Sequence, residues 1–260
     1  MVAVDRNSLG ENVRLATYNT MFCMDGRNTA GIIRSIIAVH ILRSERVVHR
    51  YSRYLKDVFS LVAEIDPKIL CLNEILLSIH GAELTNELKD MGYVSIVEGK
   101  TTHHKHPLEI GSILASKYNC EDLNFQLPFG DRTGGGGGSG ALYIPDLNLT
   151  AVGVHLGVRP KYRREHISVL VGLIRQQMGI GRHIAILGDF NKEFSGNNLF
   201  VDELGLRDYT LPSYPAHGSG THFQRKFDHI FLDPGINVGD IQRRRGLSDH
   251  FLLYCSLREG

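Results

Sequence analysis

The chain has 260 residues, of which 42% are hydrophobic, so it has enough apolar material for a large buried core, and we predict one domain over 1–260. The 29 Lys and Arg residues nearly balance the 28 Asp and Glu residues. The resulting net charge of +1 argues against a protein that wraps nucleic acid with a uniformly basic surface, so a polyanion would be bound by local patches.

Targeting and redox features predict a cytoplasmic protein. The N-terminus carries charged residues before any apolar run, unlike a secretory signal, and no uncharged stretch reaches the roughly 18 residues of a transmembrane segment. The four cysteines are widely spaced, and Cys71 and Cys255 lie in apolar runs. We therefore expect reduced thiols in the core rather than disulfides or a zinc site.

The N-terminal part of the chain predicts two buried strands that end in polar residues. Residues 13–19 form an apolar run that ends on Asn19, and residues 69–75 (ILCLNEI) form a second run that carries Glu74. The chain between these strands predicts an apolar insertion at about 25–45 and an amphipathic helix over 46–65.

Five consecutive glycines, residues 134–138, stand out in the middle of the chain. Such a composition predicts a flexible loop over 134–140, and its purity suggests the hypothesis that it is an engineered linker that replaces a native loop. Other elements predicted in this part are strands at 93–97, 110–116, 141–144 and 149–156, the last carrying His155, and a helix at 162–178.

Residues 184–191 (IAILGDFN) are the most informative stretch. The apolar run predicts a strand buried on both faces, after which Asp189 and Asn191 share one face while Phe190 turns into the core. A carboxylate and a carboxamide at a strand end can hold a water and a phosphoryl oxygen together, although Gly, Asp and Asn are also common turn residues. With further strands at 227–232 and 251–257 and few helices, we expect two facing sheets with helices outside.

Polar residues end each of these apolar strands, and burying them is costly unless they meet one another or an ion. These residues are Asn19, Glu74, His155, Asp189, Asn191, Asp228, Asp249 and His250. In order and local context they resemble the endonuclease/exonuclease/phosphatase superfamily, through the motifs LATYN (15–19), LCLNEI (70–75), VGVHL (152–156), ILGDFN (186–191), FDHIF (227–231) and LSDH (247–250). The resemblance implies a deoxyribonuclease-I-like α/β (α+β) fold, a four-layer sandwich of two mixed, mainly antiparallel β-sheets flanked by helices.

The resemblance also implies a metal site. Glu74 would be the principal metal ligand, Asn19 would contact metal-bound water or phosphate, and Asp249 would be a second acidic group near the metal. Oxygen ligands without thiolates suit a hard cation, so the expected cofactor is Mg²⁺ or Mn²⁺.

By the same likeness, five residues would carry the reaction. Asp189 would position or deprotonate the attacking water, and Asn191 would bind the phosphoryl oxygen. His250, oriented by Asp228, would be a cationic or hydrogen-bonding clamp on the phosphate. His155 would contact the phosphate or protonate the leaving group, and which histidine is the acid stays open.

Several basic and imidazole residues have two interpretations. Arg163 and Arg164 begin a helix, where they either bind a substrate phosphate or solvate the helix face. His155 is either functional or a satisfied core histidine. The cluster at 103–106 (HHKH) reads better as a solvated basic loop than as a metal site, and 243–245 (RRR) is either a track for a nucleic-acid backbone or a solvated face.

The first functional hypothesis is therefore a metal-dependent phosphodiesterase that hydrolyses nucleic acid by in-line attack of water. A second keeps the chemistry but takes a lipid headgroup, an inositol phosphate or a protein–DNA adduct as substrate. A third is a binding protein that has lost catalysis, against which the complete set of carboxylates and histidines argues. We predict no obligate protein partner, and the sequence does not predict the oligomeric state.

Overall fold

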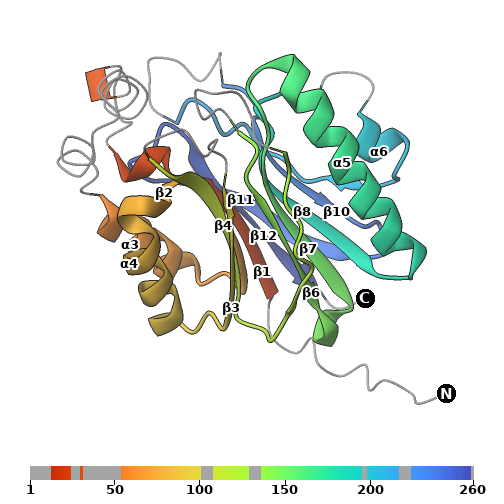
Figure 1. The fold of residues 1–260 in the computed structure, drawn as a ribbon. Coiled ribbons are helices and arrows are strands. Elements are labelled where there is room, and N and C mark those ends of the chain that lie inside the picture. The colour runs from red at the N-terminus through yellow and green to blue at the C-terminus, as the bar shows by residue number, and fades with distance from the viewer. Residues whose placement is uncertain are drawn as a thin grey trace.

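The computed structural model of the protein describes residues 13–24, 30–31, 54–100, 108–128, 136–194, 198–216 and 224–258. Within these ranges, two six-stranded sheets lie face to face with helices on the outer side of each (Figure 1). The predicted sandwich of two mixed sheets between helices is therefore confirmed. None of the helices in these ranges is long and apolar enough to cross a membrane.

The strands of each sheet come from both halves of the chain. The first sheet has the order β11 (Asn237–Arg245), β12 (Phe251–Arg258), β1 (Val13–Asn19), β2 (Ile69–Leu76), β4 (Ile110–Ser116) and β3 (Ser95–Lys100). The second has the order β5 (Glu121–Asp122), β6 (Ser139–Ile144), β7 (Leu149–His155), β8 (His183–Asp189), β10 (Asp228–Leu232) and β9 (Arg207–Asp208). Helices α3 (Leu55–Ile65) and α4 (Leu77–Asp90) cover the first sheet, and α5 (Pro160–Gly179) and α6 (Leu199–Asp202) cover the second (Figure 1); short 3₁₀ turns lie at η1 (Met21–Cys23) and η3 (Pro145–Leu147).

Three hydrophobic clusters fill the three interfaces between these layers. Strand β8 shows how one strand serves two of them: Ala185 and Leu187 belong to the cluster between the sheets, whereas Ile184 and Ile186 belong to the cluster beneath α5. Because both faces of β8 are buried, its sequence is a continuous apolar run rather than an alternating one.

The two parallel strand pairs bring the polar strand ends together. β1 pairs with β2 so that Asn19 lies opposite Asn73, and β7 pairs with β8 so that His155 lies opposite Asp189. Parallel strands end at the same edge of a sheet, and β1 also packs against β8, as β2 does against β7. Four strands of two sheets therefore end at one edge of the sandwich.

The described part of the glycine run differs from the predicted loop over 134–140. Gly137 N donates to His155 O (2.6 Å), and His155 N donates to Gly138 O (2.9 Å), so this segment continues the pairing of β6 with β7. Gly136 has φ +79°, and a Cβ atom there would lie 2.3 Å from Leu156 O. Glycine is thus required at position 136, residues 137–138 extend the ladder with β7, and Ser139 and Gly140 of the predicted loop lie in β6.

Most predicted elements are present with shifted ends. The predicted helix at 162–178 is α5, and the predicted strand at 93–97 begins later, at β3. Helix α4 and strand β11 were not predicted. The four cysteines are free thiols, as expected. Outside the described residues lie nearly all of the apolar insertion at 25–45, the first part of the helix predicted over 46–65, and the cluster at 103–106.

Candidate active site

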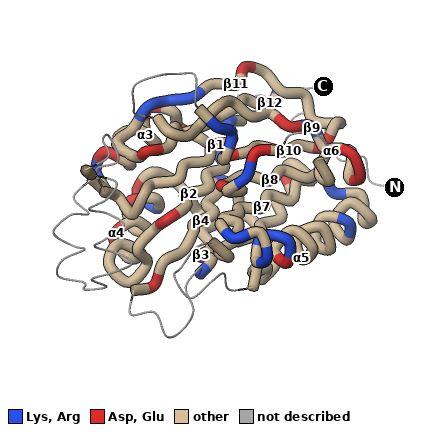
Figure 2. The backbone as a smooth tube through the Cα atoms, turned by 90° about the horizontal axis from the view of Figure 1, so that it is seen from above, with Lys and Arg blue, Asp and Glu red and all other residues tan. Residues whose placement is uncertain are grey.

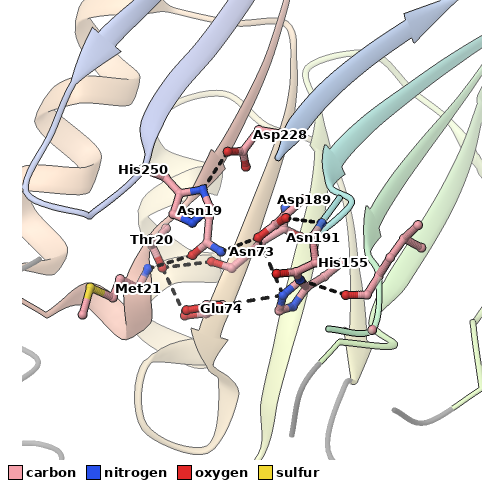
Figure 3. A network of polar contacts seen from close by, with 12 residues as sticks. Asn19, Thr20, Met21, Asn73, Glu74, His155, Asp189, Asn191, Asp228 and His250 are labelled. Atoms are coloured by element: carbon pink, nitrogen blue, oxygen red, sulfur yellow. Dashed lines mark hydrogen bonds and ion pairs between the residues drawn. The ribbon is translucent and has the colours of Figure 1, made fainter. Parts of the chain in front are cut away.

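Asn19 and Asp189 join the two sheets at the edge where the parallel strands end (Figure 3). Asn19 Nδ2 donates to Asp189 Oδ2 (2.9 Å), and Asn191 N donates to Asp189 Oδ1 (2.7 Å), so both carboxylate oxygens are fixed. Gly188, with φ +151°, precedes Asp189, and a Cβ atom there would lie 1.9 Å from Val154 O. Only glycine lets the backbone of β8 approach β7 this closely.

Glu74 is placed by an irregularity in β2. The pairing of β2 with β4 shifts register between Leu72 and Ile75, and Glu74 has φ +56°, a conformation that non-glycine residues seldom adopt. Thr20 Oγ1 donates to Glu74 O (3.1 Å) and stabilises this turn. The irregularity aims the carboxylate across the sheets, where Glu74 Oε1 lies 3.8 Å from His155 Nε2.

His155 lies between two carboxylates. Its Nε2 atom is 3.8 Å from Glu74 Oε1 and 3.9 Å from Asp189 Oδ2. Neither ring nitrogen has a hydrogen-bond partner among the described residues, although the side chain is buried. A satisfied core histidine would have such partners, so this geometry favours a histidine that faces a ligand.

Asp228 and His250 form a second link between the sheets. His250 Nδ1 lies 2.6 Å from Asp228 Oδ2, and Asp228 pairs across the ladder with Asp189. Ser248 Oγ accepts from His250 N (3.1 Å) and donates to Asn19 O (2.6 Å). Asp228 thus holds the imidazole, and Ser248 holds the backbone of the residue that carries it.

The two arginines proposed for phosphate binding differ in their surroundings. Arg163 Nη1 donates to the backbone oxygens of Asn191 (2.9 Å), Val158 (2.8 Å) and Gly157 (3.3 Å). Arg164 is exposed and makes no hydrogen bond or ion pair with a described residue. Arg163 therefore fastens the start of α5 to the loop after β8, where Asn191 Nδ2 donates to Leu156 O (2.9 Å).

Burial and neighbouring charges shift the pKa values of the site residues in opposite directions. Burial raises the pKa of Glu74 to about 8, with a further rise from Asp249, and raises the pKa of Asp189 to about 6, with a further rise from Asp228. Burial lowers the pKa of His155 to about 4. Burial also opposes the charged form of His250, but the Asp228 carboxylate outweighs it and holds the pKa well above the usual value. At neutral pH, His155 is neutral and His250 is an imidazolium.

The residues fit a hard divalent cation. The ligand atoms of Glu74, His155 and Asp189 lie within 4.8 Å of one another, as do those of Asp189, Asp228 and His250. Asp228 Oδ1, like the nitrogens of His155, is buried without a hydrogen-bond partner among the described residues. The carboxylate oxygens, with no thiolate among the donors, suit a hard cation such as Mg²⁺ or Mn²⁺, whereas an imidazole donor suits softer divalent metals. Asp249 belongs to neither group; its Oδ1 accepts from Ser248 Oγ (3.3 Å).

Two site residues were missed by the sequence analysis. Asn73, with its amide oriented to suit its neighbours, donates to Val154 O (3.2 Å) and accepts from Asp189 N (3.1 Å). The ring of Tyr214 lies 4.9 Å from the ring of His250. Asn73 could have been predicted, because it is a polar residue within the apolar run ILCLNEI. Tyr214 lies in a polar, proline-containing segment, where no pattern marks it as a site residue.

The arginines at 243–245 are used within the protein. Arg243 Nη1 donates to Pro212 O and to Gln224 Oε1 (2.9 Å), and Arg245 Nε donates to Ala216 O (2.9 Å). Arg244 points to the other face of β11 and pairs with Glu64 (3.3 Å). These contacts favour structural support of the segment 212–216 over a track for nucleic acid.

The sequence of the chain matches the model of the endonuclease/exonuclease/phosphatase family over residues 16–250. The chain belongs to this family. Family members are phosphoric ester hydrolases, so the protein is a phosphoesterase. No curated protein matches its sequence.

Solved structures of this family share its fold. An endonuclease/exonuclease/phosphatase protein from Beutenbergia cavernae is 18% identical, with a TM-score of 0.65 over 96% of this chain and 72% of that one. ANGEL2, a 2′,3′-cyclic phosphatase, is 15% identical, with a TM-score of 0.67 over 95% of each chain. A mannosyl-6-phosphatase from Bacteroides thetaiotaomicron is 18% identical, with a TM-score of 0.57 over 95% of this chain and all (100%) of that one. These likenesses establish the deoxyribonuclease-I-like fold and leave the substrate open.

Proposed function

We propose that this phosphoesterase is a divalent-cation-dependent phosphodiesterase that hydrolyses nucleic acid. The observation that carries the proposal is the convergence of Asn19, Glu74, Asp189, Asp228 and His250 from both sheets. Buried carboxylates that lie this close to one another repel unless a cation or a proton lies between them.

The proposed cation site comprises Glu74 as the principal ligand with Asn19 and Asp249 beside it. Mg²⁺ or Mn²⁺ held there would supply positive charge that neutralises the phosphate and stabilises the transition state. The raised pKa of Glu74 supports this assignment, because a nearby cation is what would keep this carboxylate ionised at neutral pH.

Asp189 is the proposed base that positions the attacking water and accepts its proton. Hydrogen bonds from Asn19 Nδ2 and Asn191 N fix its two oxygens, so the remaining lone pairs have defined directions. A pKa of about 6 suits a base that is ionised at neutral pH and still accepts a proton during the reaction.

His250 is the proposed phosphate clamp. With Nδ1–H donated to Asp228, the Nε2–H of the imidazolium is left to donate to a phosphoryl oxygen as charge grows there. The second hydrogen of the Asn191 amide is proposed to donate to the same phosphate. His155 is neutral, so in the free enzyme it suits hydrogen bonding to the phosphate better than the role of general acid.

A nucleic-acid substrate is supported by the likeness of the fold to a 2′,3′-cyclic phosphatase, and a small phosphomonoester by its likeness to a mannosyl-6-phosphatase. The test is an assay with Mg²⁺ or Mn²⁺ across single-stranded DNA, duplex DNA, RNA, a tyrosyl-DNA adduct, sphingomyelin, inositol phosphates and mannose 6-phosphate. We expect hydrolysis of nucleic acid, abolished by EDTA. Turnover of only the phosphomonoesters would reject the nucleic-acid substrate.

A further inference from the structure

Exposed cations border one side of the candidate site. They come from the start of α5, from the loop after β8 and from the residues before β10; Figure 2, which looks down on the end of the molecule that carries the site, shows Lys and Arg at the start of α5 and just before β10. We call these residues the basic rim: Lys161, Arg164, Lys192, Arg225 and Lys226.

Hydrogen bonds join the three segments of the basic rim next to the site. Arg163 Nη1 donates to Asn191 O, which joins the start of α5 to the loop that carries Lys192. His229 Nε2 lies 3.1 Å from Lys192 O and 3.0 Å from Lys226 O, which joins that loop to the residues before β10. The three segments that carry the rim are therefore held together next to Asn191 and Asp228.

The charges of the rim are available to a ligand. None of its five side chains forms an ion pair with a carboxylate in the part of the chain that the structure describes, whereas Lys117 pairs with Asp66 and Arg175 with Glu203. Its three segments contain two exposed carboxylates, Glu165 and Glu193, so positive charge prevails in a chain that is nearly neutral overall. Local excess charge beside a site attracts an oppositely charged polymer.

Aromatic rings accompany three of the cations. Lys161 Nζ lies 5.9 Å from the ring of Tyr162, Lys192 Nζ 5.0 Å from that of Phe194, and the Arg225 guanidinium 6.0 Å from that of Phe227. The three rings are half-buried at the surface. Cations interleaved with aromatic rings are typical of surfaces that bind single-stranded nucleic acid, because phosphates contact the cations and unpaired bases stack on the rings.

We propose that the basic rim binds a single strand of nucleic acid through several phosphates next to the one that is hydrolysed. This inference rests on the proposed function for its substrate class. It goes further in stating that the strand passes from the start of α5, over the loop after β8, to the residues before β10, and that the partner is an oligonucleotide rather than an isolated phosphoester.

Binding without hydrolysis tests the proposal. Fluorescence anisotropy of a labelled 12-nucleotide oligothymidylate is measured in EDTA over a range of NaCl concentrations. Two rim variants, K161Q/R164Q and K192Q/K226Q, each remove two charges, and the control K89Q/R207Q removes two exposed charges outside the rim. Each phosphate contact on a single strand contributes roughly 0.7 to the magnitude of the slope of log K against log salt. Each rim variant removes two such contacts, so the magnitude of its slope should be smaller by about 1.4.

Each outcome decides one claim. Rim variants that bind the oligonucleotide with the same slope as the control variant would overturn the rim as a binding surface. A duplex of the same length that binds wild-type protein as tightly as the single strand would overturn the single-strand assignment. Wild-type protein that binds through the rim but hydrolyses no nucleic acid with Mg²⁺ or Mn²⁺ would reject the proposed function and leave the rim intact.

Discussion

His250 Nδ1 and Asp228 Oδ2 lie 2.6 Å apart and join the loop before β12 in one sheet to the start of β10 in the other. Asn19 and Asp189 join the same two sheets by a second hydrogen bond. The site is therefore assembled by the packing of the sheets, and a residue that changes this packing changes the relative placement of base and clamp.

The Asp228–His250 pair predicts a shift in the pH profile. Asp228→Asn removes the carboxylate that raises the pKa of His250, so the imidazolium should be lost at lower pH. We expect kcat/KM to fall by about 100-fold at neutral pH and the alkaline limb of its pH profile to move to lower pH. The control Asp233→Asn breaks another Asp–His pair, with His183 at 3.4 Å, which lies outside the site. An unchanged alkaline limb in Asp228→Asn would contradict the clamp.

Glu74 predicts that the metal-free protein loses stability as pH rises. Its pKa is raised from 4.5 to about 8 in the folded state. Below pH 4.5 Glu74 is protonated in both the folded and the unfolded protein and does not affect stability. At higher pH it ionises in the unfolded protein but stays protonated in the folded one, which lowers the free energy of unfolding. Between pH 6.5 and 8, above the usual pKa of histidine, this effect of Glu74 should lower the free energy of unfolding by roughly 2 kcal/mol.

The measurement is urea unfolding in EDTA at several pH values. Glu74→Gln should reduce the slope of the free energy of unfolding against pH over this range. Mg²⁺ should stabilise the wild type at pH 8 but not the variant. Equal slopes for wild type and Glu74→Gln would show that Glu74 is already ionised in the free protein.

We predict that the ring of Tyr214 positions His250. The Tyr214 ring contacts the rings of His250 (4.9 Å between centroids) and Phe227 (5.2 Å), and arginines of β11 donate to the backbone oxygens of Pro212 and Ala216 on either side. Tyr214→Ala should lower kcat by about tenfold with little change in KM, since the ring orients His250. Tyr214→Phe keeps the ring and should retain activity. Equal losses in the two variants would assign the effect to the hydroxyl group.

Arg163 predicts a loss in kcat rather than in substrate binding. Arg163→Ala removes three hydrogen bonds to backbone oxygens, one of which is the backbone oxygen of Asn191. We expect kcat to fall by about tenfold with KM nearly unchanged. Arg175→Ala, on the same helix and paired with the exposed Glu203, is the control and should change neither. A rise in KM with constant kcat would instead make Arg163 a phosphate ligand.

Much of the site could be predicted because each key residue directly follows or ends a buried apolar run. The runs before Asn19, Glu74, His155 and Asp189 are β1, β2, β7 and β8, which form the parallel pairs. Parallel pairing itself places these ends together, so the strand ends were sufficient to predict the convergence.

Other features depend on contacts that sequence patterns do not encode. Strand β11 is mostly exposed at the edge of its sheet and has no apolar run, and in α4 the buried positions include His80 and Gly81, which weaken the helical pattern. The 243–245 run has the two interpretations of a track for nucleic acid or a solvated face when it is treated as one patch, but alternation along a strand sends Arg244 to one face and its neighbours to the other. The role of Gly136 depends on the proximity of Leu156 O, which is a tertiary contact.

The central claim is that Asp189, held between the two sheets, acts as base in cation-dependent hydrolysis of a phosphodiester. The most direct measurement is the single-turnover rate of oligonucleotide cleavage at saturating Mg²⁺ for wild type and Asp189→Asn, with folding checked by thermal unfolding. The account predicts a loss of at least about 100-fold in a folded variant. A folded Asp189→Asn protein that cleaves the oligonucleotide at the wild-type rate would contradict it.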